Sequence, residues 1–347
     1  MKVLITTEFY LPFICGVTTA VLNEKKALEA LGHEVRVLTI ADVHSPEYKD
    51  GVYYVKKNFP SLYKDSYVAV GPTRLMKDII SWKPDVVHSQ CEFFTMAYAK
   101  RVVRKLNIPL IHTCHTDFDS YGIHFTSNKR LWKHLTHKWI PRFMKRADYI
   151  ICPTDKVESL LKSYGVKNEM EIIPAGMDLE HLEQSLDEDE RKRIRADYGI
   201  KQSDVVFVSV SRLSEEKNIA ESIDHFASLL KIRPGIKMLI VGDGSERENL
   251  EKKVAEMRLE EVIRFTGQID MKDVWKYFKA GDIFISSSLS ETQGLTYIEA
   301  LSAALPIVCR NDDALNMSLI EGVNGYGFDT DEEFIEKVLP LVDDPVL

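Results

Sequence analysis

The chain has 347 residues, of which 45% are hydrophobic and 28% are charged, and its formal net charge at pH 7 is −8. This composition is typical of a globular protein and excludes a disordered chain, and the length favours two domains over a single hydrophobic core. No run of about 18 apolar residues is present, which argues against a membrane-spanning helix. Because Glu8 follows Lys2 so closely, the amino terminus predicts a first β-strand and not a signal peptide.

Charge is distributed unevenly along the chain. Residues 1–180 contain 25 Lys and Arg against 20 Asp and Glu, whereas the remaining residues contain 20 against 33. A basic first half suggests that this half meets an anionic surface. The five cysteines are odd in number and scattered, which predicts free, buried thiols in a reduced, cytoplasmic setting.

Short β-branched runs alternate with longer amphipathic stretches, a pattern that predicts parallel sheets with crossover helices. In the first half, strands are expected at Lys2–Thr6, Glu34–Thr39, Val86–His88, Leu110–Thr113 and Tyr149–Cys152, with a helix over Thr18–Leu31. In the second half, strands are expected at Val205–Ser209, Met238–Val241, Val262–Phe265, Ile283–Ile285 and Pro306–Val308, with helices over Ala220–Leu230 and Leu250–Met257.

Two separate successions of β-α units favour two doubly wound domains. A (β/α)₈ barrel is the alternative, but it needs one uninterrupted cycle of about 250 residues. Pro174 and Gly176 interrupt the pattern, which predicts domains over residues 1–176 and 177–347. The charged stretch from Asp187 to Arg195 predicts a solvated surface helix.

Ligands of open parallel sheets bind beyond the carboxyl ends of the strands. After the first strand, Gly16 and Val17 precede a helix whose start favours an anion, although a plain turn glycine is equally compatible. The absence of a G-x-G-x-x-G motif argues against a nicotinamide enzyme. His115, after Leu110–Thr113, could donate to a substrate hydroxyl, move a proton or serve a structural purpose.

Asp117 and Asp119 form a D-x-D pair, a spacing that can hold a divalent cation. The same spacing recurs at Asp187/Asp189 and Asp329/Asp331. In an acidic protein such pairs arise by chance, so no metal site is expected.

Charged side chains follow two strands of the second half. Arg212 and Lys217 lie near a helix start, which suits a diphosphate, with a solvated loop as the alternative. Further on, Gly294 precedes a helix expected to begin near Leu295, which again makes an anion cradle. Glu291 would then lie in the loop and Glu299 one turn inside the helix. Two such carboxylates could bind the hydroxyls of a sugar and of a ribose. A buried acid without a partner is costly, so a ligand that supplies hydrogen bonds would explain an acid inside this apolar helix.

Together these segments resemble the retaining GT-B glycosyltransferases of family 4, which include phosphatidylinositol mannosyltransferases, sucrose-phosphate synthases and bacterial diacylglycerol glucosyltransferases. The likeness covers nearly the whole chain, and its most specific element is the Glu291/Glu299 spacing of eight. Supporting segments are Ser211-Arg212-Leu213, Lys217-Asn218, Val241-Gly242-Asp243-Gly244 and Phe265-Thr266-Gly267. Residues 291–299 and the single glycine of Cys15-Gly16-Val17 are most similar to the bacterial 1,2-diacylglycerol 3-glucosyltransferases.

The resemblance implies an α/β protein of GT-B architecture, with two Rossmann-like, doubly wound parallel-sheet domains facing each other across a cleft. It also implies site roles. The donor diphosphate would be bound by Arg212, Lys217 and the amides of Gly16 and Val17. The nucleobase would be bordered by Gly242, Gly267 and Gln268.

The same resemblance implies how the sugar rings are held. Glu299 would bind the ribose, and Glu291, with the amides of Gly294 and Leu295, would bind the transferred hexose. His115 would bind the hexose near its 6-hydroxyl, and Glu291 and His115 are the candidate catalytic residues.

The implied activity is transfer of a hexose, with retention, from a UDP-hexose donor such as UDP-glucose to a membrane lipid such as diacylglycerol. No tightly bound cofactor is expected, Mg²⁺ would at most stimulate, and no nucleic acid would bind. The alternatives are a soluble sugar, polyprenyl-linked or polysaccharide acceptor, a sugar-nucleotide epimerase, and a silent membrane-binding adaptor. An epimerase needs placed acid/base residues that are not evident, and a silent relative need not keep all four of Arg212, Lys217, Glu291 and Glu299.

Residues 128–146 contain seven Lys and Arg, two His and no acid, and Trp132, Leu135, Trp139 and Phe143 recur at helical spacing. Such a segment suits an interfacial helix on anionic lipid, which would place the bacterial enzyme on the cytoplasmic face of the cell membrane. The alternatives are that the stripe packs into the first domain or that the charges line a nucleic-acid groove. The expected membrane-binding residues are Lys129, Arg130, Trp132, Lys133, Lys138, Trp139, Arg142, Phe143, Lys145 and Arg146.

Two departures from the family pattern stand out. Ala304 occupies a position where relatives often have glycine, which should mildly disturb local packing. The chain also stops at Leu347, where relatives usually continue into a helix that crosses back onto the first domain, so a shortened chain is expected.

Overall fold

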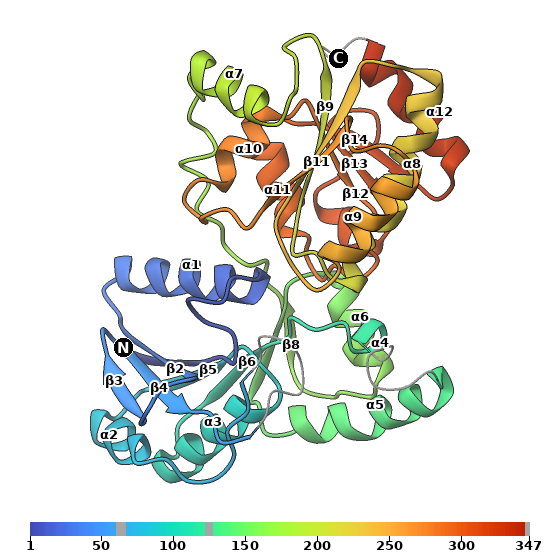
Figure 1. Cartoon of the computed structure of the whole chain (residues 1–347). Helices are drawn as coiled ribbons and strands as arrows, with labels where there is room; N and C mark the ends of the chain where they lie inside the picture. Colours follow the sequence, from blue (N-terminus) through green and yellow to red (C-terminus); the bar gives the residue numbers. More distant parts are fainter. Residues whose placement is uncertain (60–66, 122–127, 344–347) are drawn as a thin grey trace. The chain divides into compact units, whose positions relative to one another are not determined.

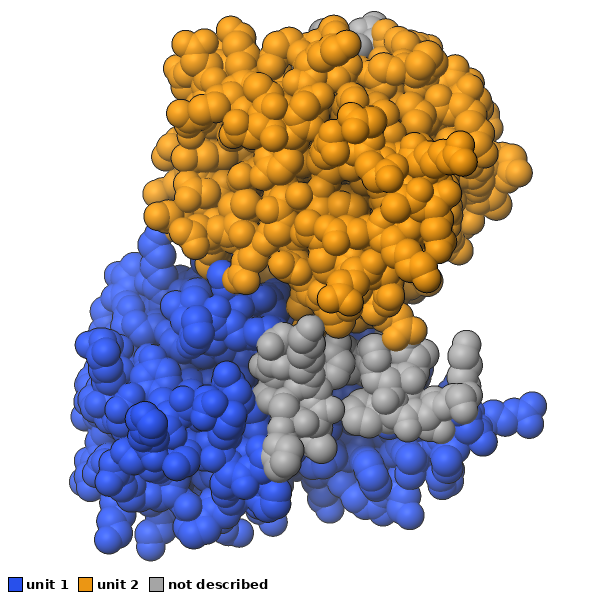
Figure 2. Space-filling view, viewed as in Figure 1, with its two compact units in different colours: residues 1–177 blue, residues 178–347 orange. Residues whose placement is uncertain are grey.

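Parallel strands form one sheet in each half of the chain. The computed structural model describes residues 1–59, 67–121 and 128–343. The chain divides into two compact units, Met1–Met177 and Asp178–Leu347 (Figure 2). Among the described residues, no helix is both long enough and apolar enough to cross a membrane.

The first unit contains an eight-stranded sheet in the order β3-β4-β2-β1-β5-β6-β7-β8, parallel except for the β3–β4 pair. Its strands are β1 Lys2–Thr6, β2 Glu34–Ala41, β3 Glu47–Lys49, β4 Val52–Lys56, β5 Val86–Ser89, β6 Leu110–Thr113, β7 Tyr149–Cys152 and β8 Met170–Ile172. Its helices are α1 Gly16–Ala30, α2 Leu75–Trp82, α3 Phe94–Leu106, α4 Phe118–Tyr121, α5 Lys129–Met144 and α6 Asp155–Ser163. The winding reverses between β1 and β5, which lie side by side.

The second unit contains a six-stranded parallel sheet in the order β11-β10-β9-β12-β13-β14. Its strands are β9 Val205–Val210, β10 Ile236–Val241, β11 Ile263–Gly267, β12 Ile283–Ser286, β13 Ile307–Arg310 and β14 Gly325–Phe328. Its helices are α7 Glu188–Asp197, α8 Ile219–Ile232, α9 Arg247–Glu256, α10 Val274–Ala280, α11 Leu295–Ser302 and α12 Asp331–Asp343, with 3₁₀ turns η2 Glu215–Lys217 and η3 Asp313–Met317. Here the winding reverses between β9 and β12.

Helices cover both faces of each sheet, as Figure 1 shows: α1 lies opposite α2 and α3 in the first unit. Alternate residues of one strand serve the two faces, because side chains of a strand alternate in direction. On β1, Leu4 packs with the residues of α2 and α3, whereas Val3 and Ile5 pack with Val21 of α1. In the second unit, α8, α9 and α12 cover one face and α10 and α11 the other. Because helices cover both faces of each sheet, the ends of the strands are the part of the sheet that is left uncovered.

Every strand predicted from the sequence is present, with ends shifted by no more than two residues, and the barrel alternative is excluded by the two separate sheets. Four short strands were not predicted: β3, β4, β8 and β14. The β3–β4 hairpin turns at Asp50 and Gly51, both at positive φ, an Asp-Gly signal that the sequence did contain. β8 is a three-residue edge strand, and β14 contains two glycines, so neither shows a β-branched run.

The prediction of a fully solvated helix near residues 187–195 was wrong at its carboxyl end. Arg195 of α7 is 1% exposed, and its guanidinium binds both carboxylate oxygens of Asp282, at 2.7 and 2.8 Å. It also donates to the carbonyl oxygens of Ala280 and Asp204. A buried guanidinium is tolerated because all its hydrogen-bonding groups find acceptors, so this charged stretch is partly an anchor and not a solvated surface.

The backbone conformation at Ala304 explains why relatives often have glycine at this position. Its φ is +64°, in the left-handed region that glycine adopts without strain, and it follows the last turn of α11. Because the residue is exposed, the alanine methyl meets solvent and the cost is confined to the backbone.

Candidate functional site

The reversal point of the second sheet brings together two loops that are far apart in the sequence. The loop after β9 carries Arg212 and Lys217, and the loop after β12 carries Glu291. Lys217 Nζ lies 2.5 Å from Glu291 Oε1, and both side chains are partly buried, at 25% and 13% exposure. Since β9 and β12 are adjacent, their carboxyl ends place these residues where ligands of doubly wound sheets bind.

Arg212 is held by a neighbour in its own loop. Its Nη2 donates to Glu216 Oε1 at 2.7 Å, and Ser214 Oγ donates to the same oxygen at 2.7 Å. Burial opposes ionisation of Glu216, but the hydrogen bond from Ser214 and the charge of Arg212 outweigh it and lower the pKa of that carboxyl. Both candidate diphosphate cations therefore contact carboxylates in this structure.

Glycines bring the loop after β10 against the loop of Arg212. A Cβ at Gly242 would lie 2.0 Å from Ser211 O, and one at Gly244 would lie 2.2 Å from Leu213 O. Only glycine permits this approach. Two backbone hydrogen bonds, Ser211 N to Val241 O and Leu213 N to Asp243 O, hold the loops together. The glycines thus fix the backbone on both sides of Arg212.

The candidate nucleobase residues lie along the same edge. Gly242 N donates to Gly267 O at 3.2 Å, which joins the ends of β10 and β11. Gly267 has φ +75°, and Gln268, which follows it, is exposed. The structure therefore places Gly242 and Gly267 in contact and leaves the Gln268 side chain in solvent.

α11 begins at Leu295, where the sequence predicted its start. Gly294 before it has φ +68°, and an added Cβ would lie 2.3 Å from the ring of Tyr297. Tyr297 is fully buried against Phe284, so it cannot move aside. Glycine at 294 is therefore required twice, by its backbone conformation and by the ring beneath it.

Glu299 lies one turn inside α11 and is half-buried. Burial raises the pKa of its carboxyl from 4.5 to about 7. A carboxyl in such a place is stabilised by ligand hydroxyl groups that donate to it. Hydroxyl groups that donate to Glu299 would therefore favour its ionised form.

The first unit contributes backbone amides and a histidine at its own strand ends. α1 begins at Gly16 after Cys15, with no side-chain cap and no acid in its first turn. The amides of Gly16 and Val17 have no hydrogen-bond partner among residues 1–59, 67–121 and 128–343. Uncapped amides at the start of a 15-residue helix suit an anion.

His115 is held beyond β6 by Gln90, which follows β5. His115 Nε2 lies 2.6 Å from Gln90 Oε1. Burial lowers the pKa of this histidine to about 4, so the ring is neutral at physiological pH. No motif in the sequence points to Gln90, although its place directly after β5 puts it at the same edge of the sheet as His115.

The D-x-D acids serve local structure. Asp117 accepts from Asp119 N and lies 3.9 Å from Lys156 Nζ. Asp187 caps α7, and Asp331 bonds His225. Within the described ranges, no group of three or more His, Cys, Asp or Glu side chains could hold a metal ion.

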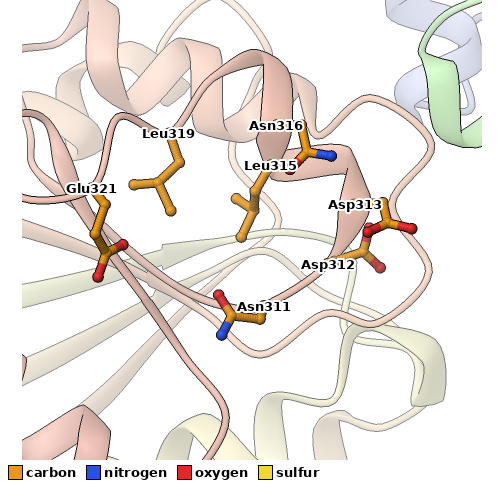
Figure 3. Close-up of a pocket in the computed structure, with 7 residues that line it drawn as sticks. All are labelled: Asn311, Asp312, Asp313, Leu315, Asn316, Leu319 and Glu321. Carbon is orange, nitrogen blue, oxygen red and sulfur yellow. The ribbon is translucent and has the colours of Figure 1, made fainter.

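A cavity of about 370 Å³ opens beyond β13 (Figure 3). It is lined by Asn311, Asp312, Asp313, Leu315, Asn316, Leu319 and Glu321. Two of its three carboxylates have partners: Asp312 accepts from Ala314 N, and Glu321 bonds Lys337 and Gly327 N. The cavity therefore has mixed polar and apolar walls.

On α5, three members of the expected apolar stripe, Trp132, Leu135 and Phe143, are half-buried, and Trp139 is 52% exposed. Trp132 donates to Phe118 O at 2.6 Å, and Phe143 packs edge-on against Phe93. Leu131, outside the expected stripe, is 49% exposed. The basic residues Arg130, Lys133, Lys138, Arg142, Lys145 and Arg146 are also exposed, whereas the side chain of Lys129 lies outside the described residues.

Comparison with known proteins matches both units to sequence families. Residues 14–181 match the model Glycosyltransferase Family 4, and residues 190–347 match Glycosyl transferases group 1. The alpha-monoglucosyldiacylglycerol synthase of Streptococcus pneumoniae is 32% identical over 320 residues, 91% of this chain and 72% of the relative. That of Acholeplasma laidlawii is 30% identical over 359 residues, 99% and 89% of the two chains. The chain belongs to glycosyltransferase family 4.

Members of this family are retaining, nucleotide-sugar-dependent hexosyltransferases. The fold of this glycosyltransferase agrees, since the crystal structure of HepE from Anabaena in complex with UDP and glucose matches it with a TM-score of 0.78. That likeness covers 99% of this chain and 90% of HepE at 18% identity. The two parallel sheets are thus those of the GT-B fold.

Sequence reasoning missed the residues of this glycosyltransferase that hold its charged groups in place. Glu216, four residues after Arg212 and bound to it in the structure, has no distinguishing signal in the sequence. The same is true of Tyr297, whose ring requires glycine at position 294. Such partners emerge only from tertiary packing.

The raised pKa of Glu299 predicts a pH-dependent stability. The folded chain binds a proton at Glu299 up to about pH 7, whereas the unfolded chain loses it near pH 4.5, so stability falls as pH rises between these values. We expect the free energy of unfolding of Glu299→Gln to equal that of the native chain below pH 4.5. Above pH 7 it should exceed that of the native chain by about 2–3 kcal/mol. Urea unfolding at a series of pH values measures this, with the exposed Glu260→Gln as control. Parallel curves for native chain and Glu299→Gln would contradict the assignment.

Proposed function

We propose that this glycosyltransferase transfers glucose from UDP-glucose, with retention, to a membrane lipid acceptor such as diacylglycerol. Two curated relatives at 30% identity or above, matched over most of their length, are named alpha-monoglucosyldiacylglycerol synthases. HepE, which shares the fold, has been crystallised with UDP and glucose. These likenesses support a UDP-linked donor and a glycolipid product.

The observation that carries the lipid acceptor is the exposed face of α5. Basic side chains and the exposed Trp139 and Leu131 occupy one helix that carries no acidic residue. A helix with cationic and apolar residues exposed together binds anionic bilayers at their interface. We therefore propose that the first unit faces the membrane and the acceptor, and that the enzyme acts at the cytoplasmic surface.

The second unit is proposed to bind the donor. Arg212 and Lys217 would neutralise the diphosphate, Glu291 with the amides of Gly294 and Leu295 would hold the glucose, and Glu299 would accept from the ribose hydroxyls. Gly242, Gly267 and Gln268 would border the base. Gly16, Val17 and His115 are assigned to phosphate and hexose contacts from the first unit.

Catalysis on this proposal is mainly positioning and neutralisation of charge. The glucosyl carbon develops oxocarbenium character as the bond to the nucleoside diphosphate breaks, and the leaving group accumulates negative charge. Fixed cations beside the diphosphate stabilise that charge most where it is greatest, in the transition state. Lys217 would exchange its contact with Glu291 for the phosphate, which releases Glu291 to the sugar.

Transfer assays with a panel of labelled nucleotide sugars test this function. We expect label from UDP-glucose to enter the lipid phase when vesicles contain diacylglycerol and anionic lipid, and free UDP to appear in step. Transfer to soluble sugars without vesicles would favour the alternative of a soluble or polysaccharide acceptor. A lack of reaction with every activated sugar would contradict the proposal as a whole.

Lys217→Ala should lower turnover in that assay by about 100-fold, because one phosphate-neutralising charge is lost. The free energy of unfolding should change by only about 1 kcal/mol, since the side chain is partly solvated. Lys252→Ala is the matched control: this lysine of α9 is 77% exposed and 3.7 Å from Glu256. Turnover like the native enzyme's in Lys217→Ala would remove Lys217 from the mechanism.

Vesicle sedimentation tests the membrane-binding face of α5. Lys133→Gln combined with Lys138→Gln should weaken binding to anionic vesicles by about 30-fold, at about 1 kcal/mol for each charge removed. The control is Lys231→Gln combined with Lys252→Gln, which removes two exposed charges of the second unit. Equal, weak binding of the native protein to anionic and neutral vesicles would end this part of the proposal.

A further inference from the structure

We infer that Gln90, itself oriented by Glu24, holds His115 in the tautomer protonated at Nε2 and so makes Nδ1 an acceptor for a hydroxyl of the donor hexose. Gln90 and Glu24 thereby act as positioning residues for His115. They make the site specific for a hexose hydroxyl that donates a hydrogen bond to Nδ1. The inference deepens the proposed function, on which the hexose contact of His115 rests.

Three elements of the first unit supply this chain of contacts. Glu24 lies on α1, Gln90 follows β5 and His115 follows β6. Gln90 Nε2 donates to Glu24 Oε2 at 2.6 Å, and Gln90 Oε1 lies 2.6 Å from His115 Nε2. Gln90 is 2% exposed, so water does not compete for its amide.

The amide of Gln90 has only one orientation that satisfies its neighbours. A carboxylate accepts hydrogen bonds and cannot donate them, so the group facing Glu24 must be the NH₂. His88 agrees with this orientation, because its Nδ1 lies 2.5 Å from Glu24 Oε1 and its Nε2 lies 3.3 Å from Gln90 Nε2. With Nδ1 of His88 donating to the carboxylate, Nε2 of His88 is an acceptor, which Thr113 Oγ1 approaches at 2.7 Å, and an amide oxygen beside it would be repelled.

The tautomer of His115 follows from that orientation. An amide oxygen at 2.6 Å is an acceptor, so His115 Nε2 must carry the proton. Burial holds the ring neutral, because it outweighs the opposing effect of the Glu92 charge, while His112 and His88 lower the pKa further and Glu24 raises it. A neutral ring protonated at Nε2 has its lone pair on Nδ1. Among the residues that the structure describes, none forms a hydrogen bond with Nδ1.

A lone pair at Nδ1 defines what His115 can recognise. The facing hexose hydroxyl must donate, and the histidine cannot donate to it. The expectation from the sequence that His115 donates to a substrate hydroxyl is therefore replaced by the reverse polarity. Because Glu24 belongs to the same helix as Gly16 and Val17, the tautomer is also tied to the position of the candidate phosphate-binding amides.

Nitrogen-15 NMR of the histidine rings tests the tautomer without any substrate. Long-range ¹⁵N–¹H correlations of the full chain at pH 7 report which ring nitrogen is protonated, and the signal lost in His115→Gln assigns the residue. We expect protonation at Nε2 alone. A ring protonated at Nδ1, or at both nitrogens, overturns the inference whatever the enzyme's substrate.

Variants test whether Gln90 and Glu24 impose that tautomer. Gln90→Leu removes the acceptor and should give a mixture of tautomers, and Glu24→Gln should do so in part, because an amide no longer dictates which end of Gln90 faces it. Glu29→Gln is the matched control, because Glu29 lies on the same helix but pairs with Lys25 and takes no part in the contacts between Glu24, Gln90 and His115. Unchanged spectra in Gln90→Leu contradict the positioning role. If that variant does not fold, Glu24→Gln decides by the same criterion.

Donor analogues test the polarity at the sugar. We expect 6-deoxy- and 6-fluoro-6-deoxy-glucose donors to lose about tenfold in kcat/KM alike, because neither can donate to Nδ1. In Gln90→Leu the discrimination among the three donors should shrink. A fluoro donor used as well as the parent, with the deoxy donor poor, would show that His115 donates and would overturn the inference. Equal use of all three, with Nε2 protonated, would instead refute the proposed hexose contact alone.

Discussion

The ion pair between Lys217 and Glu291 joins the two halves of the second sheet where its winding reverses. The residues are separated by 74 positions in the sequence, yet their loops are adjacent because β9 and β12 are neighbours. Other features of this edge support the two loops that carry the pair. Asn218 at φ +50° and Gly294 at φ +68° start α8 and α11 from the left-handed region, so that each helix begins directly after its loop. Glu216 and the Gly242–Gly244 backbone then fix the segment around Arg212.

Most of the fold could be predicted from the sequence, because buried parallel strands are short β-branched runs and because some helices, such as α1, α6 and α7, are followed by a glycine at positive φ. The candidate positions followed, since strand ends are where doubly wound sheets bind ligands. The partners of those positions could not be predicted. Gln90 contacts His115 only because β5 and β6 are adjacent in the sheet. Arg195 is buried only because α7 packs beside Asp282, which binds its guanidinium. A charged residue in sequence carries no sign of whether water or protein will surround it.

α5 shows how one helix can serve both packing and a surface. Thr136, Ile140 and Met144 recur every fourth residue and are buried, while Trp139 and Leu131 lie on the exposed side. Since residues three and four apart share a helix face, the buried line and the exposed line can coexist on 16 residues. The sequence does not show which line is buried, because the exposed line carries tryptophan and leucine, residues that are typical of a core.

Partnered cations give the edge of the second sheet that carries Arg212 and Lys217 a particular electrical character. Arg212 and Lys217 each lie against a carboxylate, so the local field is that of two dipoles and not of two positive charges. A dipolar surface attracts small ions such as inorganic phosphate only over short distances, whereas bare cations would gather them from the surrounding solution. An anion that approaches Arg212 or Lys217 must therefore compete with Glu216 or Glu291 for the same nitrogen atoms.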